Sequence, residues 1–199
     1  MMNNLTINLL EDTIYEVIIT SWIDDVNFKP FGIEFSNNKI ILNLYPNKTL
    51  RNLKVNPEFI IQFTQNPLIY TKTLFNQLTT NDYDENYILQ ASDFIINAKV
   101  SKIIPHNHKD EYGNVILTQI IADIIQINQI NYTPPIINRA TNKILDLLIE
   151  YTRLPFMDIN KKNNYKDKLI NSEDFIKKTG NKLHIQSLKI LKKNFSMEE

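Results

Sequence analysis

Residues 45–64 read YPNKTLRNLKVNPEFIIQFT, and this stretch combines two strand-like segments with a short helical one. An apolar strand ends at Tyr45, and Asn47 is a suitable N-cap for a helix over residues 48–55. The helix must end near Asn56, because the proline that follows disfavours helical geometry at the preceding residue. The apolar residues 58–64 then predict a short buried strand.

The start of this helix carries the most informative chemistry in the chain. Unpaired N–H groups and the helix dipole both favour an anion at a helix N-terminus. Lys48, Thr49 and Arg51 add two positive charges and a hydroxyl to that position. The local pattern therefore predicts a phosphate site, and its alternative is an ordinary solvated helix with a capping asparagine.

The surrounding sequence is rich in β-branched and aromatic residues as far as residue 127. Asn37 and Asn38 predict a tight hairpin turn, since asparagine tolerates positive φ. The polar residues 105–113 read as a hairpin loop, and Asn66 with Pro67 predicts the start of a second helix. About six strands at this spacing favour a barrel over a parallel sheet. The expected strands cover residues 12–22, 28–35, 39–45, 58–64, 93–104 and 114–127.

The last third of the chain has helical periodicity and a different charge balance. Residues 1–138 hold 9 basic and 14 acidic side chains, whereas residues 139–199 hold 13 and 8. Pro134 and Pro135 mark the expected junction, which predicts a β-barrel domain over 1–133 and a helical domain over 134–199. Helices are expected within 135–154, 172–179 and 184–195, with residues 160–168 as a polar connector.

Composition excludes several classes of function. The formal net charge is zero, which argues against a protein that coats nucleic acid or an anionic membrane. The absence of cysteine removes thiol catalysis, disulfides and thiolate metal sites, and three glycines cannot form a glycine-rich nucleotide loop. No apolar run is long enough to span a membrane, and no targeting segment is evident, so a cytoplasmic location is expected.

Several segments together resemble the flavin-reductase-like split β-barrels, and among them an uncharacterised, mainly archaeal family of unknown function. The matching elements are the first strand, ending in Ile18-Ile19-Thr20, the segment Lys29-Pro30-Phe31-Gly32-Ile33, the stretch 45–64, and the short motifs Asn138-Arg139-Ala140 and Glu150-Tyr151-Thr152-Arg153. The resemblance implies a mainly β fold with α, namely an FMN-binding split β-barrel followed by a helical region. It also implies FMN as cofactor at the interface of a homodimer.

The family pattern, carried over residue by residue, implies ten cofactor-binding positions. The phosphate would lie at the turn, and the ring system against the strand that carries Gly32. The residues implied are Thr20, Phe31, Gly32, Asn47, Lys48, Thr49, Arg51, Asn52, Gln62 and Thr64. The chain departs from the family in having Pro46-Asn47 before Lys48-Thr49, where Gly-Ser is usual.

These features predict an FMN-dependent oxidoreductase or flavin reductase that works with a small-molecule electron donor or acceptor. No catalytic acid or base can be assigned. A flavin carrier or sensor without turnover is an alternative, and so is an interaction module that uses Lys189, Lys192 and Lys193. His106 and His108 could bind a metal, although a solvated hairpin tip is expected, and His184 is expected on an exposed helix surface.

Overall fold

A computed structural model describes residues 14–110, 113–131 and 138–196 of the chain. These residues divide into two compact units, one made of the described residues within 1–64 and 78–133 and the other of those within 65–77 and 134–199. The helix that follows the fourth strand therefore groups with the C-terminal helices, whereas the sequence placed it in the barrel domain. The expected junction at Pro134 and Pro135 lies outside the described residues.

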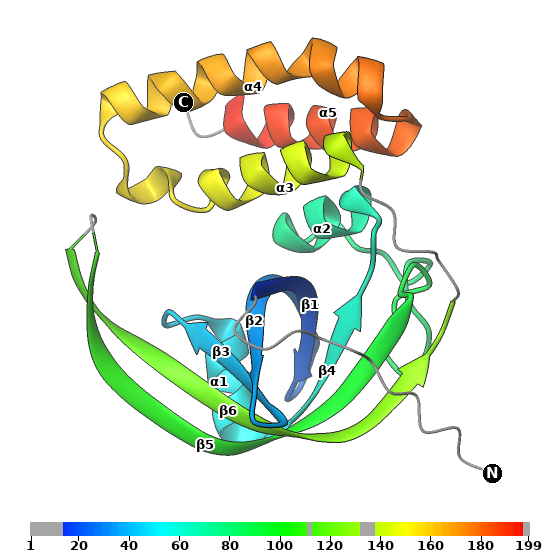
Figure 1. Ribbon diagram of the computed structural model, residues 1–199, viewed down its shortest axis with the longest axis vertical. Coiled ribbons are helices and arrows are strands. Elements are labelled where there is room, and N and C mark those ends of the chain that lie inside the picture. The colour runs from blue at the N-terminus through cyan, green and yellow to red at the C-terminus, as the bar shows by residue number, and fades with distance from the viewer. Residues whose placement is uncertain (1–13, 111–112, 132–137, 197–199) are drawn as a thin grey trace. The chain divides into compact units, whose positions relative to one another are not determined.

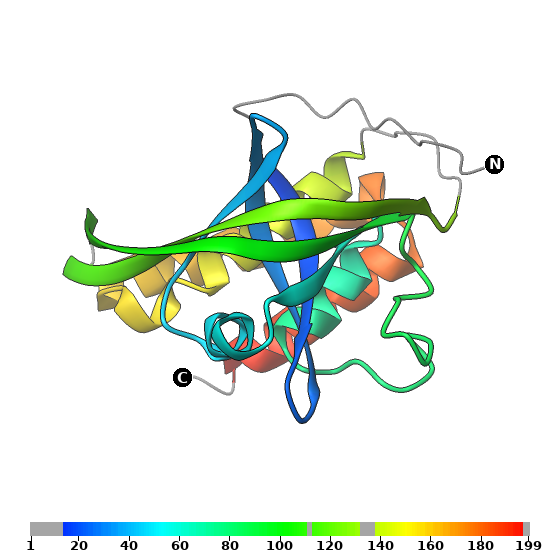
Figure 2. The same cartoon turned by 90° about the horizontal axis from the view of Figure 1, so that it is seen from below.

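The first unit is a closed antiparallel barrel in which the strand order is β1-β2-β3-β6-β5-β4 (Figures 1 and 2). Its strands are β1 (Ile14–Trp22), β2 (Val26–Ser36), β3 (Lys39–Leu44), β4 (Glu58–Phe63), β5 (Phe94–Asp110) and β6 (Gly113–Gln129). The helix α1 (Lys48–Val55) connects β3 to β4. The predicted six-stranded barrel and the helix over 48–55 are confirmed.

Strand alternation decides which residues fill the barrel. The inward-facing positions of each strand carry large aliphatic and aromatic side chains, and Leu50 and Leu53 of α1 join the same core. Among the core residues are Val17, Ile19, Ile33, Phe35, Leu42, Phe59, Ile61 and Ile120. At the β2–β3 turn Asn37 and Asn38 have φ values of 50° and 59°, as the Asn-Asn pair predicts.

The hairpin of β5 and β6 is much longer than the other strands and curves along the barrel (Figure 1). Residues 94–99 pair with β4, and residues 118–123 pair with β3. The prediction of a loop over 105–113 is wrong, because residues 105–110 continue β5 and pair with β6. Polar side chains are tolerated there because, within the described part of the chain, these residues pair with one strand only.

The second unit consists of helices α2 (Pro67–Leu74), α3 (Arg139–Tyr151), α4 (Ile159–Thr179) and α5 (Lys182–Ser196), with a 3₁₀ turn at Leu154–Phe156. The predicted connector over 160–168 is wrong, since α4 runs through it. Tyr165, Leu169 and Ile176 are buried at helical spacing and hold this polar helix on its neighbours. Tyr165 also donates to the carbonyl of Leu147 at 3.1 Å.

Candidate functional site

The helix α1 begins as the sequence predicts. Asn47 is extended, and its side-chain oxygen accepts a hydrogen bond from the N–H of Leu50 at 2.8 Å. Its carbonyl accepts from the N–H of Arg51 at 3.1 Å. The helix ends at Asn56, whose N–H donates to the carbonyl of Asn52. These contacts fix the position from which the first turn of α1 presents its side chains.

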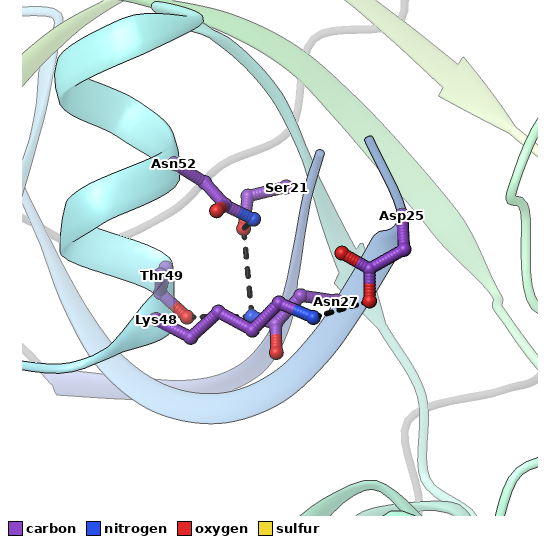
Figure 3. Close-up of polar contacts among 6 residues, drawn as sticks. All are labelled: Ser21, Asp25, Asn27, Lys48, Thr49 and Asn52. Carbon is purple, nitrogen blue, oxygen red and sulfur yellow. Dashed lines mark hydrogen bonds and ion pairs between the residues drawn. The ribbon is translucent and has the colours of Figure 1, made fainter. Parts of the chain in front are cut away.

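Beneath α1 lies a buried polar cluster that joins the helix to strands β1 and β2 (Figure 3). The side-chain amide of Asn27 donates to the hydroxyl of Thr49 at 2.9 Å. The amide of Asn52 donates to the hydroxyl of Ser21 at 3.3 Å, and Asn27 reaches the same hydroxyl at 3.5 Å. Thr49 and Asn52 are each only 1% exposed. In this structure both residues therefore act as supports that hold α1 on the barrel.

Above this cluster, charged side chains form a rim, which we define as the exposed Asp25 and Arg51 with the partly buried Lys29 and Lys48. The ammonium of Lys48 lies 2.5 Å from the carboxylate of Asp25, and both side chains are substantially exposed (Figure 3). The hydrogen bond from Lys48 lowers the pKa of Asp25. Burial, and next the charge of Lys48, lower the pKa of Lys29. The rim thus holds three cationic side chains against one carboxylate, which favours an anion.

Lys29 and Asn27 are members of this region that sequence reasoning missed. Both lie on β2, and the pairing of β2 with β1 brings Asn27 opposite Ser21. Alternation places Lys29 on the same strand face as Asn27. The available signal was a lysine between Phe28 and Pro30 in a strand rich in apolar residues, because such a side chain must lie near the barrel end to reach water.

Two of the predicted residues, Thr20 and Gln62, lie elsewhere, in a second buried network around Gln62. The Gln62 amide nitrogen donates to the Thr20 hydroxyl at 2.7 Å and to the Tyr87 carbonyl at 2.9 Å. Its oxygen accepts from the Leu89 N–H and the Ser92 hydroxyl, both at 2.8 Å. Gln62 therefore uses its whole amide within the chain.

Thr64 belongs to the same part of the barrel unit. Its hydroxyl donates to the carbonyl of Ala91 at 2.6 Å. Thr20 and Ser21 are consecutive in β1, so their side chains point to opposite faces of the strand. The structure therefore does not gather the ten predicted residues in one place, and it separates Thr20, Gln62 and Thr64 from the group at α1.

Gly32 and Phe31 lie on β2, with Gly32 opposite Glu16 of β1. Gly32 is exposed, whereas Phe31 is partly buried against the barrel core. A Cβ at Gly32 would lie 2.9 Å from the Cγ2 of Ile14, so this position accepts a larger residue only if Ile14 moves. Burial raises the pKa of the neighbouring Glu16. The assignment of all ten residues to a cofactor stays a prediction.

Comparison with known proteins identifies the family. A family model described as the N-terminal domain of a protein of unknown function (DUF447) matches residues 15–128. A second model, described as a protein of unknown function (DUF447), matches residues 138–193. The chain belongs to the DUF447 family. This confirms the resemblance to an uncharacterised, mainly archaeal family of the split-barrel type.

Two of the proteins similar to this DUF447 protein match nearly its whole length. An uncharacterised protein of Methanocaldococcus jannaschii, MJ1453, is 25% identical over 190 residues, which are 92% of this chain and 99% of the relative. The FMN-bound protein MM1853 of Methanosarcina mazei has the same fold, with a TM-score of 0.75 and 14% identity over 92% of this chain and 95% of that one. A styrene monooxygenase flavin reductase of Pseudomonas putida gives a TM-score of 0.47 and 11% identity over 57% of this chain and 78% of that one.

The histidines of this DUF447 protein form no metal centre in the described residues, where no group of three or more His, Cys, Asp or Glu side chains is placed to hold an ion. His106 and His108 lie on β5 opposite Leu117 and Val115. Among the described residues, no helix is both long and apolar enough to cross a bilayer.

The prediction that His184 is exposed is wrong. Its side chain is buried between the N-terminal turns of α3 and α5, where Nε2 lies 3.0 Å from the Thr141 hydroxyl. Nδ1 accepts from the N–H of Asn181 at 3.1 Å. Burial lowers the pKa of His184. The contact with Thr141, 43 residues away, was not visible in the local sequence.

Proposed function

We propose that this DUF447 protein binds FMN and uses it as a flavin-dependent oxidoreductase or flavin reductase. The observation that carries the proposal is its similarity to FMN-bound MM1853 of the same family, which extends over 92% of this chain. When bound, FMN supplies the hydride and electron chemistry, so the protein has to position the cofactor and the small molecule that reacts with it.

The rim at α1 suits the FMN phosphate. Lys48 and Arg51 are accessible cations on the first turn of the helix, and Lys29 adds a third positive charge beside Lys48. Thr49 and Asn52 would support the site by fixing the helix on the barrel. Gly32 offers an exposed strand position without a side chain, where a flat ring can approach the backbone once the exposed side chain of Ile14 moves aside.

The proposal includes a homodimer, and the long β5–β6 hairpin supports it. Among described residues, the part of β5 beyond Val100 pairs only with β6, and Ile116 on the opposing strand is 57% exposed. A two-stranded ribbon with open edges and exposed apolar side chains is marginal in water, so a second copy is a suitable cover. A cytoplasmic location stays a prediction from the sequence.

The test is a titration of the purified protein with FMN, followed by calorimetry and flavin absorbance. Replacing Lys48 and Arg51 together by glutamine should weaken FMN binding by about 2–4 kcal/mol, because two charge-assisted contacts are lost. Lys54→Gln, at the exposed C-terminal end of the same helix, is the matched control and should bind FMN as the wild type does.

Turnover and assembly are measured on the same samples. The FMN-loaded protein should oxidise a reduced nicotinamide or deazaflavin donor faster than free FMN does, and light scattering should give the mass of a dimer. FMN binding without donor oxidation would favour a flavin carrier or sensor. Failure of the wild-type protein to bind FMN would refute the proposal.

A further inference from the structure

The segment between α2 and β5 folds into a tight hairpin of its own. Tyr83 and Leu89 form an isolated antiparallel bridge. Between them, the carboxylate of Asp84 accepts hydrogen bonds from the N–H groups of Asn86 at 2.9 Å and Ile88 at 2.8 Å. The N–H of Asp84 in turn donates to the carbonyl of Ile88. This hairpin, residues 83–89, is therefore determined by its own short-range contacts.

Strand β4 of the barrel also holds this hairpin, through the side chain of Gln62. Gln62 holds the Tyr87 carbonyl and the Leu89 N–H, and Leu89 is completely buried. On the segment that follows, the side-chain amide of Asn131 donates to the carbonyls of Gln90 at 3.1 Å and Ser92 at 2.7 Å. Together these hydrogen bonds hold the backbone of the hairpin in a single conformation.

That conformation includes an unusual backbone angle at Tyr87, whose φ is +62°. The other positive-φ residues among those described, glycines aside, are Asn37, Asn38 and Asn76, and asparagine tolerates this region. Tyrosine does not, and such strain persists where surrounding contacts over-determine it, often at ligand sites. The contacts that hold this backbone angle also fix the position from which the side chain of Tyr87 leaves the hairpin.

The ring of Tyr87 is an inner member of a row of four aromatic side chains, which we call the aromatic row. It lies 6.1 Å from Trp22 and 6.4 Å from Tyr83, whose ring is 4.9 Å from that of Phe28. Phe28 is buried, whereas the other three remain partly exposed. The row thus presents aromatic surface to solvent on a rigid support.

The register of β1 and β2 locates the aromatic row relative to Gly32. Phe28 lies opposite Thr20 and Gly32 opposite Glu16. Both positions are on the same face of β2, four residues or about 13 Å apart. A ligand on the aromatic row therefore lies on the face that carries Gly32, but beyond the place where a ring at Gly32 would lie.

We propose that the aromatic row binds a planar heteroaromatic ring of the second reactant, with Tyr87 as the stacking residue and Gln62 as the residue that positions it. The inference rests on the proposed function. Tyrosine and tryptophan faces stack on flat rings with little loss of side-chain freedom. A ring about 13 Å from Gly32 is too far from a flavin ring at Gly32 to exchange hydride with it, so the row would hold a non-reacting ring of the second reactant, such as adenine. Nicotinamide and deazaflavin rings are the comparison probes in the test.

The experiment measures direct binding of nicotinamide mononucleotide, adenosine and a deazaflavin to the wild-type protein, with and without FMN. Tyr87→Phe keeps the ring and should bind as the wild type does. Tyr87→Asn keeps a residue that tolerates positive φ but removes the ring, and should weaken binding of the preferred probe about tenfold or more. Asn86→Ala, exposed in the same hairpin, is the control and should leave binding unchanged.

A second variant tests the positioning role. Gln62→Glu keeps an oxygen for Leu89 and Ser92 but replaces the amide that donates to Tyr87 by an acceptor. It should weaken ring binding and speed hydrogen exchange of the hairpin amides. Faster exchange with unchanged ring binding would overturn the role of Gln62.

The outcomes separate the inference from the proposed function. Wild-type protein that binds FMN but none of the three probes would overturn the inference alone, as would equal probe binding by Tyr87→Asn and the wild type. Loss of FMN binding in Tyr87→Asn would also overturn it, because the aromatic row would then hold the flavin itself. If the wild-type protein does not bind FMN but binds a probe in a way that depends on Tyr87, the ring site is supported and the proposed function is refuted.

Discussion

The two faces of β1 carry two buried polar networks that differ in what they expose. On one face, Ser21 belongs to the cluster under α1, and the side chains above that cluster are charged. On the other face, Thr20 belongs to the network of Gln62, and the side chains near that network are aromatic. The first network holds the backbone of α1, and the second holds the backbone of the hairpin 83–89. The exposed side chains near each network then determine which kind of ligand could bind there. The first region suits a phosphate and the second a flat ring.

The largest effect is expected from removing Gln62, which makes four hydrogen bonds in the second network. Gln62→Leu has a similar size but leaves the Leu89 N–H, the Tyr87 carbonyl and two hydroxyls without their partner. Buried polar groups without partners cost about 1–3 kcal/mol each, so the free energy of unfolding should fall by at least about 3 kcal/mol. Urea unfolding measures it, and a loss below about 1 kcal/mol would contradict the assigned contacts.

A smaller loss is expected in the first network, because fewer bonds depend on one side chain. Thr49→Val keeps the shape of the side chain but removes the hydroxyl that accepts from Asn27. Asn27 retains only its long contact to Ser21, so the free energy of unfolding should fall by about 1–2 kcal/mol. Thr49→Ser keeps the hydroxyl and is the control. An equal loss in both variants would show that the methyl group, and not the hydrogen bond, matters.

The difference between the two networks explains what the sequence could predict. The cap at Asn47, the end of α1 and the Asn37-Asn38 turn depend on neighbouring residues, and all three are confirmed. The contacts of Gln62 join residues that are 25 to 42 positions apart in the sequence, so no local sequence pattern predicts them. The same holds for Asn27, which reaches Thr49 only because β2 folds back along β1.

Two predictions based on polar composition, the connector over 160–168 and the loop over 105–113, were wrong because tertiary contacts order these segments. The segment 160–168 is rich in lysine and asparagine, yet Tyr165 is completely buried and holds that part of α4 in the helical unit. Residues 105–110 are polar but extended, because pairing with β6 satisfies their backbone. A single apolar anchor or a single paired strand is enough to order such segments, and neither gives a strong periodic signal.

The helical unit contains a third polar network, formed by His184, Thr141 and Asn181. It differs from the other two because one of its members, His184, can change its charge with pH. Burial lowers the pKa of His184 from 6.5, so folding favours its neutral form. Its contribution to stability is present above pH 6.5 and is lost as the pH falls through the folded-state pKa. Unfolding free energies measured from pH 7.5 to 5 should therefore fall more steeply for the wild type than for His184→Gln. Parallel profiles would contradict the buried, neutral histidine.

The smallest effect on stability is expected at the rim, where Asp25 pairs with Lys48 in solvent. Exposed ion pairs contribute little, so Asp25→Asn should leave the melting temperature within about 1 °C of the wild type. The same change removes the carboxylate from the rim, and FMN binding should strengthen about two- to fivefold at low salt, with the gain lost near about 0.5 M salt. Asp24→Asn removes an equal charge next to the rim but outside the pair, so an equal gain there would show that net charge, and not the release of Lys48, is responsible. A fall in affinity in Asp25→Asn would mean that Asp25 orients Lys48 toward its ligand and does not compete with it.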